Sequence, residues 1–558
     1  MIVLGFAGLI VAALLSWCTA WFSARLSGQL TAASWAVLTA AAALFVIAGA
    51  TTLMYGPKGV PLHGLDGLGP ATLTVDRLSG LFLVITFGVA VPALVAAGAA
   101  AHHPRPRLPA AVAAALIAVA VIIPADNAFV LMFGWEALTV SFYLLAGYDR
   151  SLPDRDMGSV ATAVFGRSSG AALLIGFLLL AAHTHSFGFV RDGLDPQSAL
   201  GQAVYAALLL GFGIKVGLVP AHIWMPRGYA AAAGPARAIM AGAAVNVGFY
   251  GMWRTLDVLG APPVWLACTV LIIGGITAIL GIAHAAVNPD LAVLVAWSSV
   301  ENAGVITAGF GAGMVGAATH NPMMAAAGLV AATAQVIAHA LGKTTLFVAT
   351  AAIERATGST DLDRLGGMIR RLPWTGSALL IGSLTLAGLP LTAGFASEWL
   401  VLESLMQQFR VDALALQLST AVAGALVALT VGIAAVTFVR LVGLTVFGPT
   451  RLDEPGVCDS GVRLDRQWPH RIAVCVLIIG CLGTAMVAPL VVRMIGVGIS
   501  PIVGAAAAGA NRSPWVLQPV FAEFSALSPS WLWIVLPAMV LVILGAVAAL
   551  SGRNPLRE

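Results

Sequence analysis

Residues 213–226 read Gly213-Ile214-Lys215-Val216-Gly217-Leu218-Val219-Pro220-Ala221-His222-Ile223-Trp224-Met225-Pro226. This stretch places a lysine inside an apolar run, and a charged lysine within a membrane costs about 3 kcal/mol on insertion scales. Pro220 removes a backbone donor from the same segment, so we expect a broken helix beside the charge. A buried amine next to a helix break favours a role in moving an ion or a proton. A lysine that extends to the membrane interface is the structural alternative.

The composition predicts an all-α, polytopic membrane protein. The chain of 558 residues is 59% hydrophobic and 9% charged, with a mean hydropathy of +0.96, whereas a soluble domain carries about 25% charged residues. Apolar runs of transmembrane length recur along the chain and predict about 14 or 15 helices. The net charge of +4 is small, and basic residues in membrane loops explain it without a nucleic-acid partner.

No motif points to a redox centre, a metal or a nucleotide on this chain. The five cysteines show no Cys-x-x-Cys pair and no iron–sulfur spacing; they are Cys18, Cys268, Cys458, Cys475 and Cys481. No GxGxxG fingerprint and no Walker motif is present. We therefore expect no cofactor, metal or catalytic centre on the chain itself. The apolar N-terminus lacks a basic n-region and is expected to be a retained first helix.

Hydropathy divides the chain into four parts. N-terminal helices (1–108) precede a first five-helix repeat (109–254) and a second five-helix repeat (264–444), and residues 445–558 hold C-terminal helices and a loop. The expected helices cover residues 2–23, 31–54, 76–100, 109–124, 127–147, 158–182, 200–222, 235–254, 264–286, 291–312, 324–353, 375–392, 412–444, 468–498 and 530–551. The Gly- and Pro-rich residues 56–64 suit turns, and 499–529 is expected to be a long loop or a re-entrant segment.

The spacing of acids and prolines indicates an internal duplication. Glu136 and Glu301 are separated by nearly the same length of chain as Pro220 and Pro390. Two similar units with one broken helix each are the pattern of inverted-repeat transporters. Five is an odd number of helices, so a second copy would insert upside down relative to the first.

Loop charge predicts a protein of the cell (cytoplasmic) membrane with its N-terminus outside. Odd-numbered loops carry most of the basic residues, namely Arg25, Arg105, Arg107, Arg150, Arg155, Arg167, Arg227, Arg237, Arg355, Arg364, Arg370, Arg371, Arg451, Arg463 and Arg466. Even-numbered loops carry Lys58, Arg77, Arg191, Arg254 and Arg410. Basic residues favour the cytoplasmic side, so the odd loops are expected there.

Glu136 lies in the apolar stretch Phe133-Gly134-Trp135-Glu136-Ala137-Leu138. A carboxylate at this depth needs a partner, and we expect that partner to be Lys215. If the glutamate is protonated or moves away, Lys215 loses a nearby negative charge and releases its proton more readily. The pair can therefore act as a switch for proton release. A static ion pair, or a protonated structural glutamate, is the alternative.

Further titratable residues follow in apolar segments. His339 and Lys343 are four apart and share one helix face, which favours a proton relay over a structural histidine. Glu398 follows the second break, where a terminal proton site and an ordinary interfacial acid are both open. Glu301 is another buried carboxylate, and His222 is expected to line the first break. In chain order these groups form a lateral row across the membrane midplane.

These motifs resemble the antiporter-like membrane subunits. That family includes the proton-pumping subunits of respiratory complex I, Mrp-type antiporter subunits and relatives in membrane-bound hydrogenases. The resemblance rests on the motifs around Glu136, Lys215, His339/Lys343 and Gly388–Trp399. Ser298-Ser299-Val300-Glu301-Asn302 and Gly394-Phe395-Ala396-Ser397-Glu398-Trp399 are similar to the hydrogenase-4 component B and formate hydrogenlyase branch.

The resemblance implies about 14 helices in two inverted five-helix repeats with broken helices. It implies that Glu136 and Lys215 form the switching pair, that His339 and Lys343 form the central relay, and that Glu398 is the terminal proton site. Such subunits hold no cofactor. They work beside other membrane and redox subunits, whose electron transfer drives the changes in protonation.

The chain departs from the family pattern at several positions. Asn246 stands where the family usually has a lysine, and asparagine carries no titratable proton; a bound water could bridge it. Ala292 and Val293 replace the usual Lys-Arg after Asp290-Leu291, and Gln335 stands where some relatives have a second histidine. After the Trp-x-Pro, Arg227 and Tyr229 replace the usual acid and histidine.

Three hypotheses follow. The first is a proton-translocating membrane subunit of a hydrogenase-4-like or NADH:quinone oxidoreductase-like complex. The second is a cation/proton antiporter subunit without a redox arm. The third is a structural membrane anchor with an impaired channel, which the residues Asn246 and Ala292 favour.

Overall fold

The computed structural model describes residues 1–62, 71–100, 106–149, 155–191, 193–449, 459–513, 515–517, 520–521 and 525–551. Within these ranges, 11 helices are long and apolar enough to cross a membrane, and three shorter apolar helices accompany them. This architecture confirms the predicted all-α, polytopic membrane fold. Residues 63 and 64 of the predicted turn region, together with Arg105, Arg150, Arg451 and Cys458, lie outside the described residues.

The elements of the N-terminal half run from α1 to α10. They are α1 (Ile2–Cys18), the 3₁₀ turn η1 (Thr19–Trp21), α2 (Ala24–Tyr55), β1 (Lys58–Pro61), β2 (Thr72–Val75), α3 (Arg77–Ala99), α4 (Leu108–Ile122), α5 (Ala128–Ala146), α6 (Arg155–Thr184), α7 (Ala199–Val216), α8 (Trp224–Ala231), α9 (Gly234–Ala238), the π-helix η3 (Ile239–Ala244) and α10 (Asn246–Leu259).

The C-terminal half runs from α11 to α22. It comprises α11 (Val264–Val287), α12 (Leu291–Ala318), α13 (Pro322–Thr357), α14 (Met368–Arg371), α15 (Pro373–Leu386), α16 (Ala393–Leu405), η4 (Met406–Arg410), α17 (Leu414–Val442), the π-helix η5 (Gly443–Phe447), α18 (Asp459–Arg466), α19 (Trp468–Met486), α20 (Ala488–Gly498), α21 (Ser500–Val503), η6 (Ala506–Ala510), β3 (Asn511–Ser513), β4 (Val516–Leu517) and α22 (Pro529–Ser551).

Polar side chains fix where several helices begin. Asp76 and Ser79 form a capping box at the start of α3, in which the Ser79 backbone N–H donates to Asp76 Oδ1 over 2.8 Å. Asp290 and Asn321 accept from the backbone at the starts of α12 and α13. These contacts satisfy amide groups that the first turn of a helix leaves open, and in a membrane no bulk water can replace them.

Several expected helices are interrupted. The helix expected at 200–222 ends at Val216, and the one expected at 235–254 is divided into α9, η3 and α10. The helix expected at 375–392 ends at Leu386, and α16 follows where no helix was expected. The helix expected at 468–498 is broken between α19 and α20, ahead of Pro489. Hydropathy identifies apolar spans, but it does not show where the backbone leaves the helix and forms its hydrogen bonds with other groups.

Two expected loops contain short strands. Within 56–64, residues 58–61 form β1, which pairs antiparallel with β2 in the register Lys58↔Val75. Within 499–529, the described residues form α21, η6 and the strands β3 and β4. Both pairings join backbone groups across a loop, a form of stabilisation that Gly- and Pro-rich composition does not reveal.

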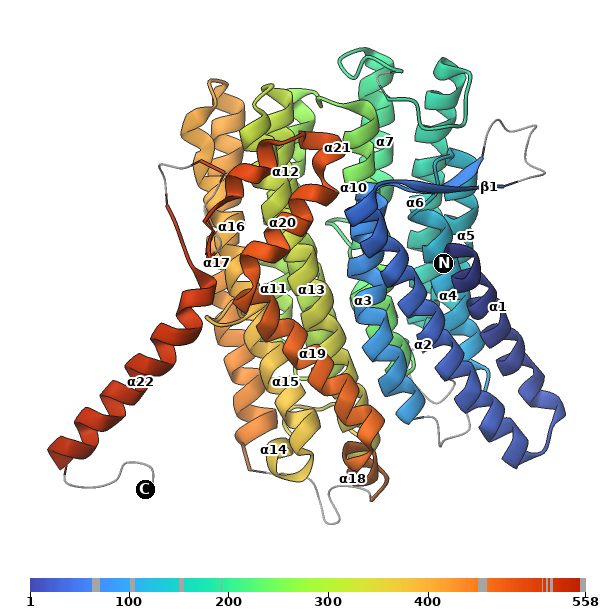
Figure 1. Cartoon of the computed structure of the whole chain (residues 1–558), viewed down its shortest axis with the longest axis vertical. Coiled ribbons are helices and arrows are strands. Elements are labelled where there is room, and N and C mark those ends of the chain that lie inside the picture. The colour runs from blue at the N-terminus through green and yellow to red at the C-terminus, as the bar shows by residue number, and fades with distance from the viewer. Residues whose placement is uncertain are drawn as a thin grey trace.

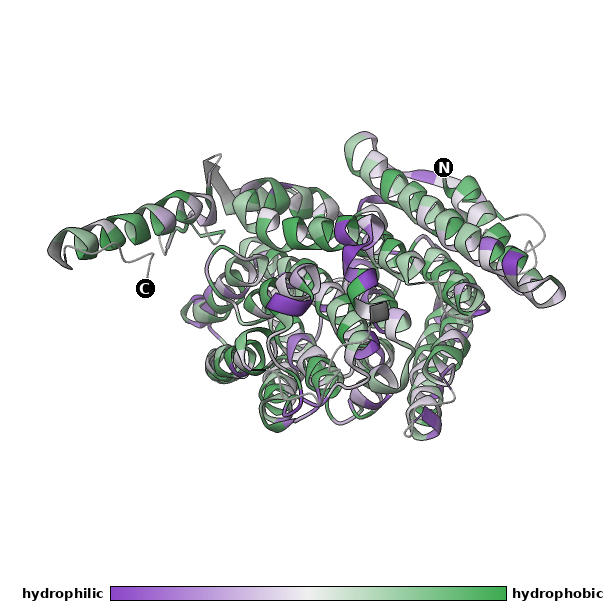
Figure 2. Cartoon of the chain, turned by 90° about the horizontal axis from the view of Figure 1, so that it is seen from below, coloured by the Kyte–Doolittle hydropathy of each residue, from purple (hydrophilic) through white to green (hydrophobic). Residues whose placement is uncertain are grey.

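The helix α13 runs through the middle of the bundle and packs against α12, α15 and α16. The helices α1 and α2 form one side, whereas α22 projects from the opposite side of the molecule (Figures 1 and 2). No residue in the most apolar part of α22 is buried within this chain, although several are partly buried. Its surface is therefore free to face lipid or another membrane protein.

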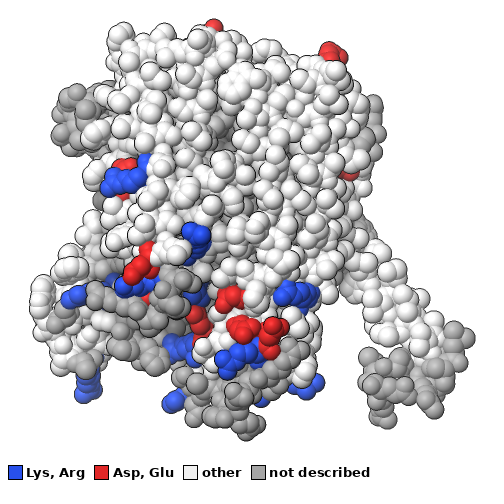
Figure 3. All heavy atoms as spheres, turned by 180° about the vertical axis from the view of Figure 1, so that it is seen from behind, with Lys and Arg blue, Asp and Glu red and all other residues white. Residues whose placement is uncertain are grey.

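Charged side chains gather at one end of the bundle. On the face seen in Figure 3, most lysine, arginine, aspartate and glutamate atoms lie at the lower end, the end at which α14 and α18 lie in Figure 1. The opposite end of that face is almost free of charge. This asymmetry agrees with the unequal loop charge read from the sequence.

An ion-pair network ties α3 to α10. Arg254, which was expected in a loop, lies in α10 and donates to both carboxylate oxygens of Asp76 over 2.7 and 2.9 Å. It also donates to Asp257 over 2.6 Å, and Asp257 pairs with Arg191 over 2.9 Å. Burial raises the pKa of Asp76, but the Arg254 guanidinium outweighs burial and brings that pKa to about 2.

Asp76→Asn is expected to lower the free energy of unfolding by roughly 2 kcal/mol at neutral pH, from the lowered pKa of the carboxyl. Because the folded-state pKa lies below the ordinary value of 3.8, the stabilisation is present above that value and is lost as the pH falls toward about 2. Thermal unfolding of the purified protein between pH 7 and pH 3 measures it. Asp195→Asn, at an exposed loop acid, is the control, and equal unfolding of Asp76→Asn and wild type at pH 7 would contradict the prediction.

Candidate functional site

The first helix break lies between α7 and α8. Gly217 has a φ of +78°, a left-handed conformation that suits glycine, and it ends α7. Beyond it, the Val219 N–H donates to the Thr277 hydroxyl of α11 over 3.1 Å. The Trp224 indole donates to the Ile214 carbonyl over 2.9 Å, which satisfies a carbonyl at the open end of α7. The interruption predicted from Pro220 is therefore present and held by specific contacts.

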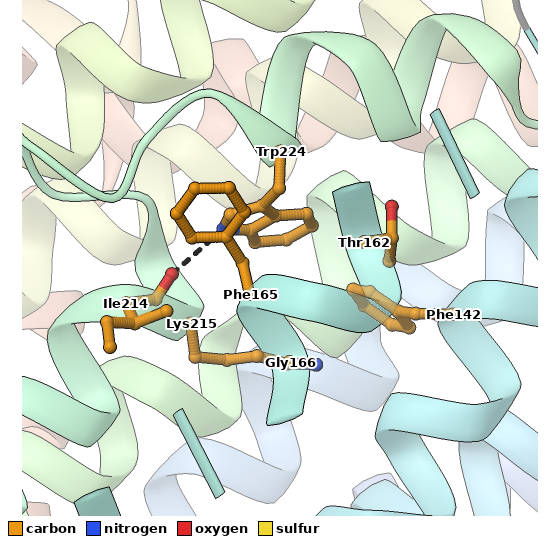
Figure 4. A pocket seen from close by; sticks show the side chains of 7 residues that line it. All are labelled: Phe142, Thr162, Phe165, Gly166, Ile214, Lys215 and Trp224. Carbon is orange, nitrogen blue, oxygen red and sulfur yellow. Dashed lines mark hydrogen bonds between the residues drawn. The ribbon is translucent and has the colours of Figure 1, made fainter. Parts of the chain in front are cut away.

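Lys215 lies in the last turn of α7, is buried, and points into a cage of aromatic rings (Figure 4). Its Nζ is 3.9 Å from the ring centroid of Phe142, 5.7 Å from that of Trp135 and 6.0 Å from that of Trp224. A small pocket beside the amine is lined by Phe142, Thr162, Phe165, Gly166, Ile214, Lys215 and Trp224. Ring faces attract an ammonium group, so the cage stabilises the charged form of Lys215 within the bundle.

Glu136 lies in α5 and pairs with Arg167 of α6, with 2.5 Å between the carboxylate and the guanidinium. The carboxylate lies over Gly170, where a side chain would collide with it. The close ion pair of Glu136 is thus with Arg167, whereas its expected partner Lys215 interacts with the carboxylate electrostatically at longer range. Arg167 was assigned to a loop, yet it lies within α6 and within the expected helix 158–182. Its place inside an expected transmembrane helix was the signal that could have identified Arg167 as a further cation within the membrane.

Asn246 and His339 occupy the middle of the bundle. Asn246 begins α10, is fully buried, and donates to the Gly242 carbonyl over 3.0 Å, while its Oδ1 has no partner among the described residues. His339 lies on α13 with its ring edge-on to Phe249, at 6.2 Å between centroids. Both of its ring nitrogens are buried, and neither has a partner in the described part of the chain.

Lys343 lies one turn beyond His339 on α13 and reaches α12. Its Nζ donates to the Val295 carbonyl over 3.1 Å and to the Ser298 hydroxyl. Glu301 is buried one turn further along α12, where the Asn302 amide donates to its Oε2 over 2.5 Å. The amine and the carboxylate thus approach one another along the same face of α12.

The second break lies between α15 and α16. Gly388 has a φ of +61°, and a side chain there would meet the carboxylate of Glu398, so only glycine fits this corner. Leu391, after Pro390, has a φ of +74°. Glu398 lies in α16 and is buried. The break predicted near Pro390 is present, and it brings the Glu398 carboxylate back against the end of α15.

A chain of side-chain hydrogen bonds joins α12 to α16. Ser397, the neighbour of Glu398, donates from its hydroxyl to Gln335 Oε1 over 2.6 Å. Gln335 on α13 donates from its Nε2 to Asn302 Oδ1 over 3.0 Å. In the sequence, Gln335 stands out only as a departure from a family pattern, and Asn302 and Ser397 were not singled out. Asn302 and Ser397 each adjoin a carboxylate in an apolar helix, which was a signal that could have found them, whereas Gln335 has no such neighbour.

His222 lies in the first break, partly buried, with its ring 5.6 Å from that of Trp297. Trp297 stacks on His284 of α11 at 4.3 Å. Among the described residues His222 Nδ1 has no hydrogen-bond partner. The residue lines the break, as expected, on the side that faces α11 and α12. No group of three or more His, Cys, Asp or Glu side chains that could hold a metal ion occurs in the described part of the chain.

Comparisons with known proteins place the chain among membrane subunits. Residues 125–427 match the family described as "NADH:quinone oxidoreductase/Mrp antiporter, TM". Hydrogenase-4 component B of Escherichia coli is 38% identical over 242 residues, which are 43% of this chain and 36% of that protein. Formate hydrogenlyase subunit 3 of the same organism is 31% identical over 269 residues, 48% of this chain and 44% of that protein. The matched regions thus span less than half of either relative.

The fold also has a close counterpart among solved structures. A chain of the membrane-bound sulfane sulfur reductase, an archaeal respiratory membrane complex, superposes with a TM-score of 0.78 at 24% identity. The superposition covers 97% of this chain and 84% of that chain. At this level of identity the likeness concerns the fold alone.

Proposed function

Since the chain belongs to the NADH:quinone oxidoreductase/Mrp antiporter family, we propose that it is the proton-translocating membrane subunit of a hydrogenase-4-like or NADH:quinone oxidoreductase-like complex. The observation that carries the proposal is the succession of titratable side chains across both helix breaks. It runs from Glu136 through Lys215, His339 and Lys343 to Glu398, and four of these five residues are buried. Buried charges within a membrane are costly and mark ion or proton pathways.

The first break supplies a switch in this proposal. Glu136 is held by Arg167, and the ammonium of Lys215 is held by aromatic rings. Transfer of the carboxylate from Arg167 to Lys215 would strengthen the hold of the lysine on its proton, and return of the carboxylate to Arg167 would weaken it. His222 lines the same break.

The centre of the row lacks a titratable residue at Asn246. An amide does not take up and release a proton, so a proton would pass Asn246 along water. Asn246 Oδ1 and both nitrogens of His339 are buried without partners in the described residues. Buried polar atoms normally bind protein groups or ordered water, and these three atoms are suited to hold such water between the two breaks.

In this proposal the second helix break holds the terminal proton site, Glu398. Lys343 is held by α12 near Glu301, and Glu398 lies against the corner at Gly388. Protonation of Glu398 beside a helix break gives a proton a place to leave the row, since broken helices in membranes commonly form ion and proton sites.

The two breaks support an inverted repeat. Each proposed unit, 109–254 and 264–444, has an acid on its second helix (Glu136 on α5, Glu301 on α12). In each, a long helix follows (α6 or α13), and then a helix broken into two parts. Residues 1–108 and 445–558 flank these units in the proposed division.

The partners proposed for this subunit are other membrane subunits and a redox arm, with no cofactor on this chain. Relatives are named as a component of hydrogenase-4 and a subunit of formate hydrogenlyase, which supports membrane-subunit partners. The uneven charge supports a place in the cytoplasmic membrane with the N-terminus outside and the charged end facing the cytoplasm.

A structural membrane anchor is the second candidate, and Asn246 favours it, because the row lacks a proton carrier there. A cation/proton antiporter subunit without a redox arm is a further alternative, to which the Mrp branch of the family belongs.

Proton uptake by vesicles that contain the purified complex tests the proposal. Glu136→Gln should assemble normally yet reduce uptake by about tenfold or more, because a positioned proton-transfer group contributes at least that factor. Asp156→Asn, at an exposed acid of α6, is the matched control and should behave as wild type. An unchanged gradient in Glu136→Gln, or no gradient in wild type, would favour the anchor.

A further inference from the structure

A chain of hydrogen bonds runs from α16 to the buried carboxylate of Glu301 on α12. It begins at Ser397, next to Glu398, passes through Gln335 and Asn302, and ends on Glu301 Oε2. All five side chains are buried. We call Ser397, Gln335 and Asn302 the polar bridge.

Every hydrogen bond in the polar bridge points the same way. The Ser397 hydroxyl donates to the Gln335 oxygen, so the Gln335 amino group faces Asn302 and donates to its oxygen. The Asn302 amino group therefore faces Glu301 and donates to the carboxylate. An ionised carboxylate only accepts hydrogen bonds, so this donor order matches a Glu301 whose Oε2 carries no proton.

The opposite donor order is also available. A proton on Glu301 Oε2 would make it a donor, and rotation of both amides would turn the oxygen of Asn302 toward Glu301 and the amino group of Gln335 toward Ser397. The Ser397 hydroxyl would then need another acceptor. It already lies 3.0 Å from the Ala393 carbonyl and 3.1 Å from the Gly394 carbonyl. The two donor orders differ at one contact: the Asn302 amino group now also donates to the Ser298 carbonyl over 3.1 Å, and rotation of the amide would give up that bond in exchange for the new bond from a protonated Glu301.

We propose that the polar bridge is a reversible hydrogen-bond switch, in which Gln335 is the positioning residue that transmits the protonation state of Glu301 to the second helix break beside Glu398. The inference rests on the proposed function, in which Glu301 and Glu398 both take part in proton movement. In the observed state the Ser397 hydroxyl is shared between Gln335 Oε1 and the carbonyls of the first turn of α16, and in the other state it would donate to those carbonyls alone. The first turn of α16 adjoins the break, so the change reaches the backbone at which Glu398 is held.

Among the described residues, the titratable groups that interact with the Glu301 carboxylate are Lys343 of α13 and Glu398 of α16. His339 lies one turn before Lys343 on α13 and interacts with that lysine. The helix α11 contacts the Glu301 backbone through Gly281, and its His284 stacks on Trp297 instead. On the other helices packed against α12, Arg227 of α8 is exposed and Arg440 of α17 donates to the Ala286 carbonyl.

The test is infrared titration of the protonated carboxyl band in the full-length protein, reconstituted in liposomes. The Glu398 band is identified by its loss in Glu398→Gln. Glu301→Gln is expected to move the midpoint of that band by about one pH unit, as for two interacting sites. In a Gln335→Met background, which keeps the side-chain length but removes both hydrogen bonds, the same change should move the midpoint by less than half as much.

Two further variants separate a switch from a merely structural role. Ser397→Ala breaks the bridge at its other end and should reproduce Gln335→Met, whereas Ser397→Thr keeps the hydroxyl and should retain the coupling. Thr350→Val is the matched control, because Thr350 is buried on α13 and bonds only to the Leu346 carbonyl of its own helix.

The inference is overturned if Glu301→Gln moves the midpoint of the Glu398 band equally in the wild-type and Gln335→Met backgrounds. It is also overturned if Glu301→Gln does not move that midpoint in the wild-type background. The titration requires no transport. If proton uptake is absent but the infrared coupling is intact, the proposed function is rejected and the switch stands. If proton uptake is present but the coupling is absent, the switch is rejected and the proposed function stands.

Discussion

Lys215→Ala is expected to reduce proton uptake into vesicles by about tenfold or more, because it removes the proton-carrying group of the first break. The amine is buried and its described contacts are with the rings of Phe142, Trp135 and Trp224. Loss of the amine leaves an apolar cage, in which no side chain takes up a proton. Assembly with partner subunits should be preserved, since the amine forms no hydrogen bond with another described residue.

Lys215→Arg makes this prediction sharper. A guanidinium keeps the positive charge within the aromatic cage but does not release a proton in proteins. If Lys215 acts as a proton carrier, the arginine variant should assemble and yet be as inactive as the alanine variant. Lys58→Ala is the control, because Lys58 is an exposed lysine of β1. Normal uptake in Lys215→Arg would show that only the charge matters and would favour a structural role.

Lys343→Met is expected to abolish uptake and also to destabilise the protein. Lys343 is the cation nearest to Glu301 on α13, and its removal leaves a buried carboxylate without a counter-charge. Removing one partner of a direct buried ion pair costs roughly 3 kcal/mol, and the cost should be smaller here because Lys343 interacts with Glu301 at longer range and donates to neutral oxygens. Methionine has a similar length and adds no cavity, so packing defects contribute little. Thermal unfolding of the purified protein measures the stability, and the vesicle assay measures uptake.

The double variant Lys343→Met/Glu301→Gln separates the two effects. Removing the charge of Glu301 should restore most of the lost stability, because no uncompensated charge remains. Uptake should stay absent, because the row then lacks both groups. Recovery of uptake in the double variant would contradict a role for Lys343 in carrying protons. No recovery of stability would show that the two side chains do not compensate one another.

The sequence predicted most of the candidate site from single residues. Charge in an apolar segment identified Glu136, Lys215, Lys343, Glu301 and Glu398, because burying a charge in a membrane is costly enough to be informative by itself. Proline marked both helix breaks. In the described residues the breaks occur where they were expected, although α16 and the division between α19 and α20 were missed.

The close ion-pair partner of Glu136 was not found from the sequence, although Glu136 and Lys215 do interact electrostatically. Sequence order suggested that Glu136 pairs with Lys215, whereas the packing of α5 on α6 brings Arg167 within 2.5 Å of the carboxylate. The members of the polar bridge carry no charge, so nothing in the chain alone separates Gln335 from any other buried amide. Their importance comes from their mutual distances.

By itself, then, the sequence determined the membrane class, the approximate spans, the helix breaks and the identity of the titratable residues. These follow from hydropathy, from the missing N–H of proline and from the cost of a buried charge, which are properties of single residues or short windows. Only the tertiary structure decided which groups meet: Glu136 with Arg167, Lys215 with three rings, and Glu301 with Ser397 through Asn302 and Gln335. Hydrogen bonds and ion pairs act over a few ångströms, and helices far apart in the chain reach that range only when they pack.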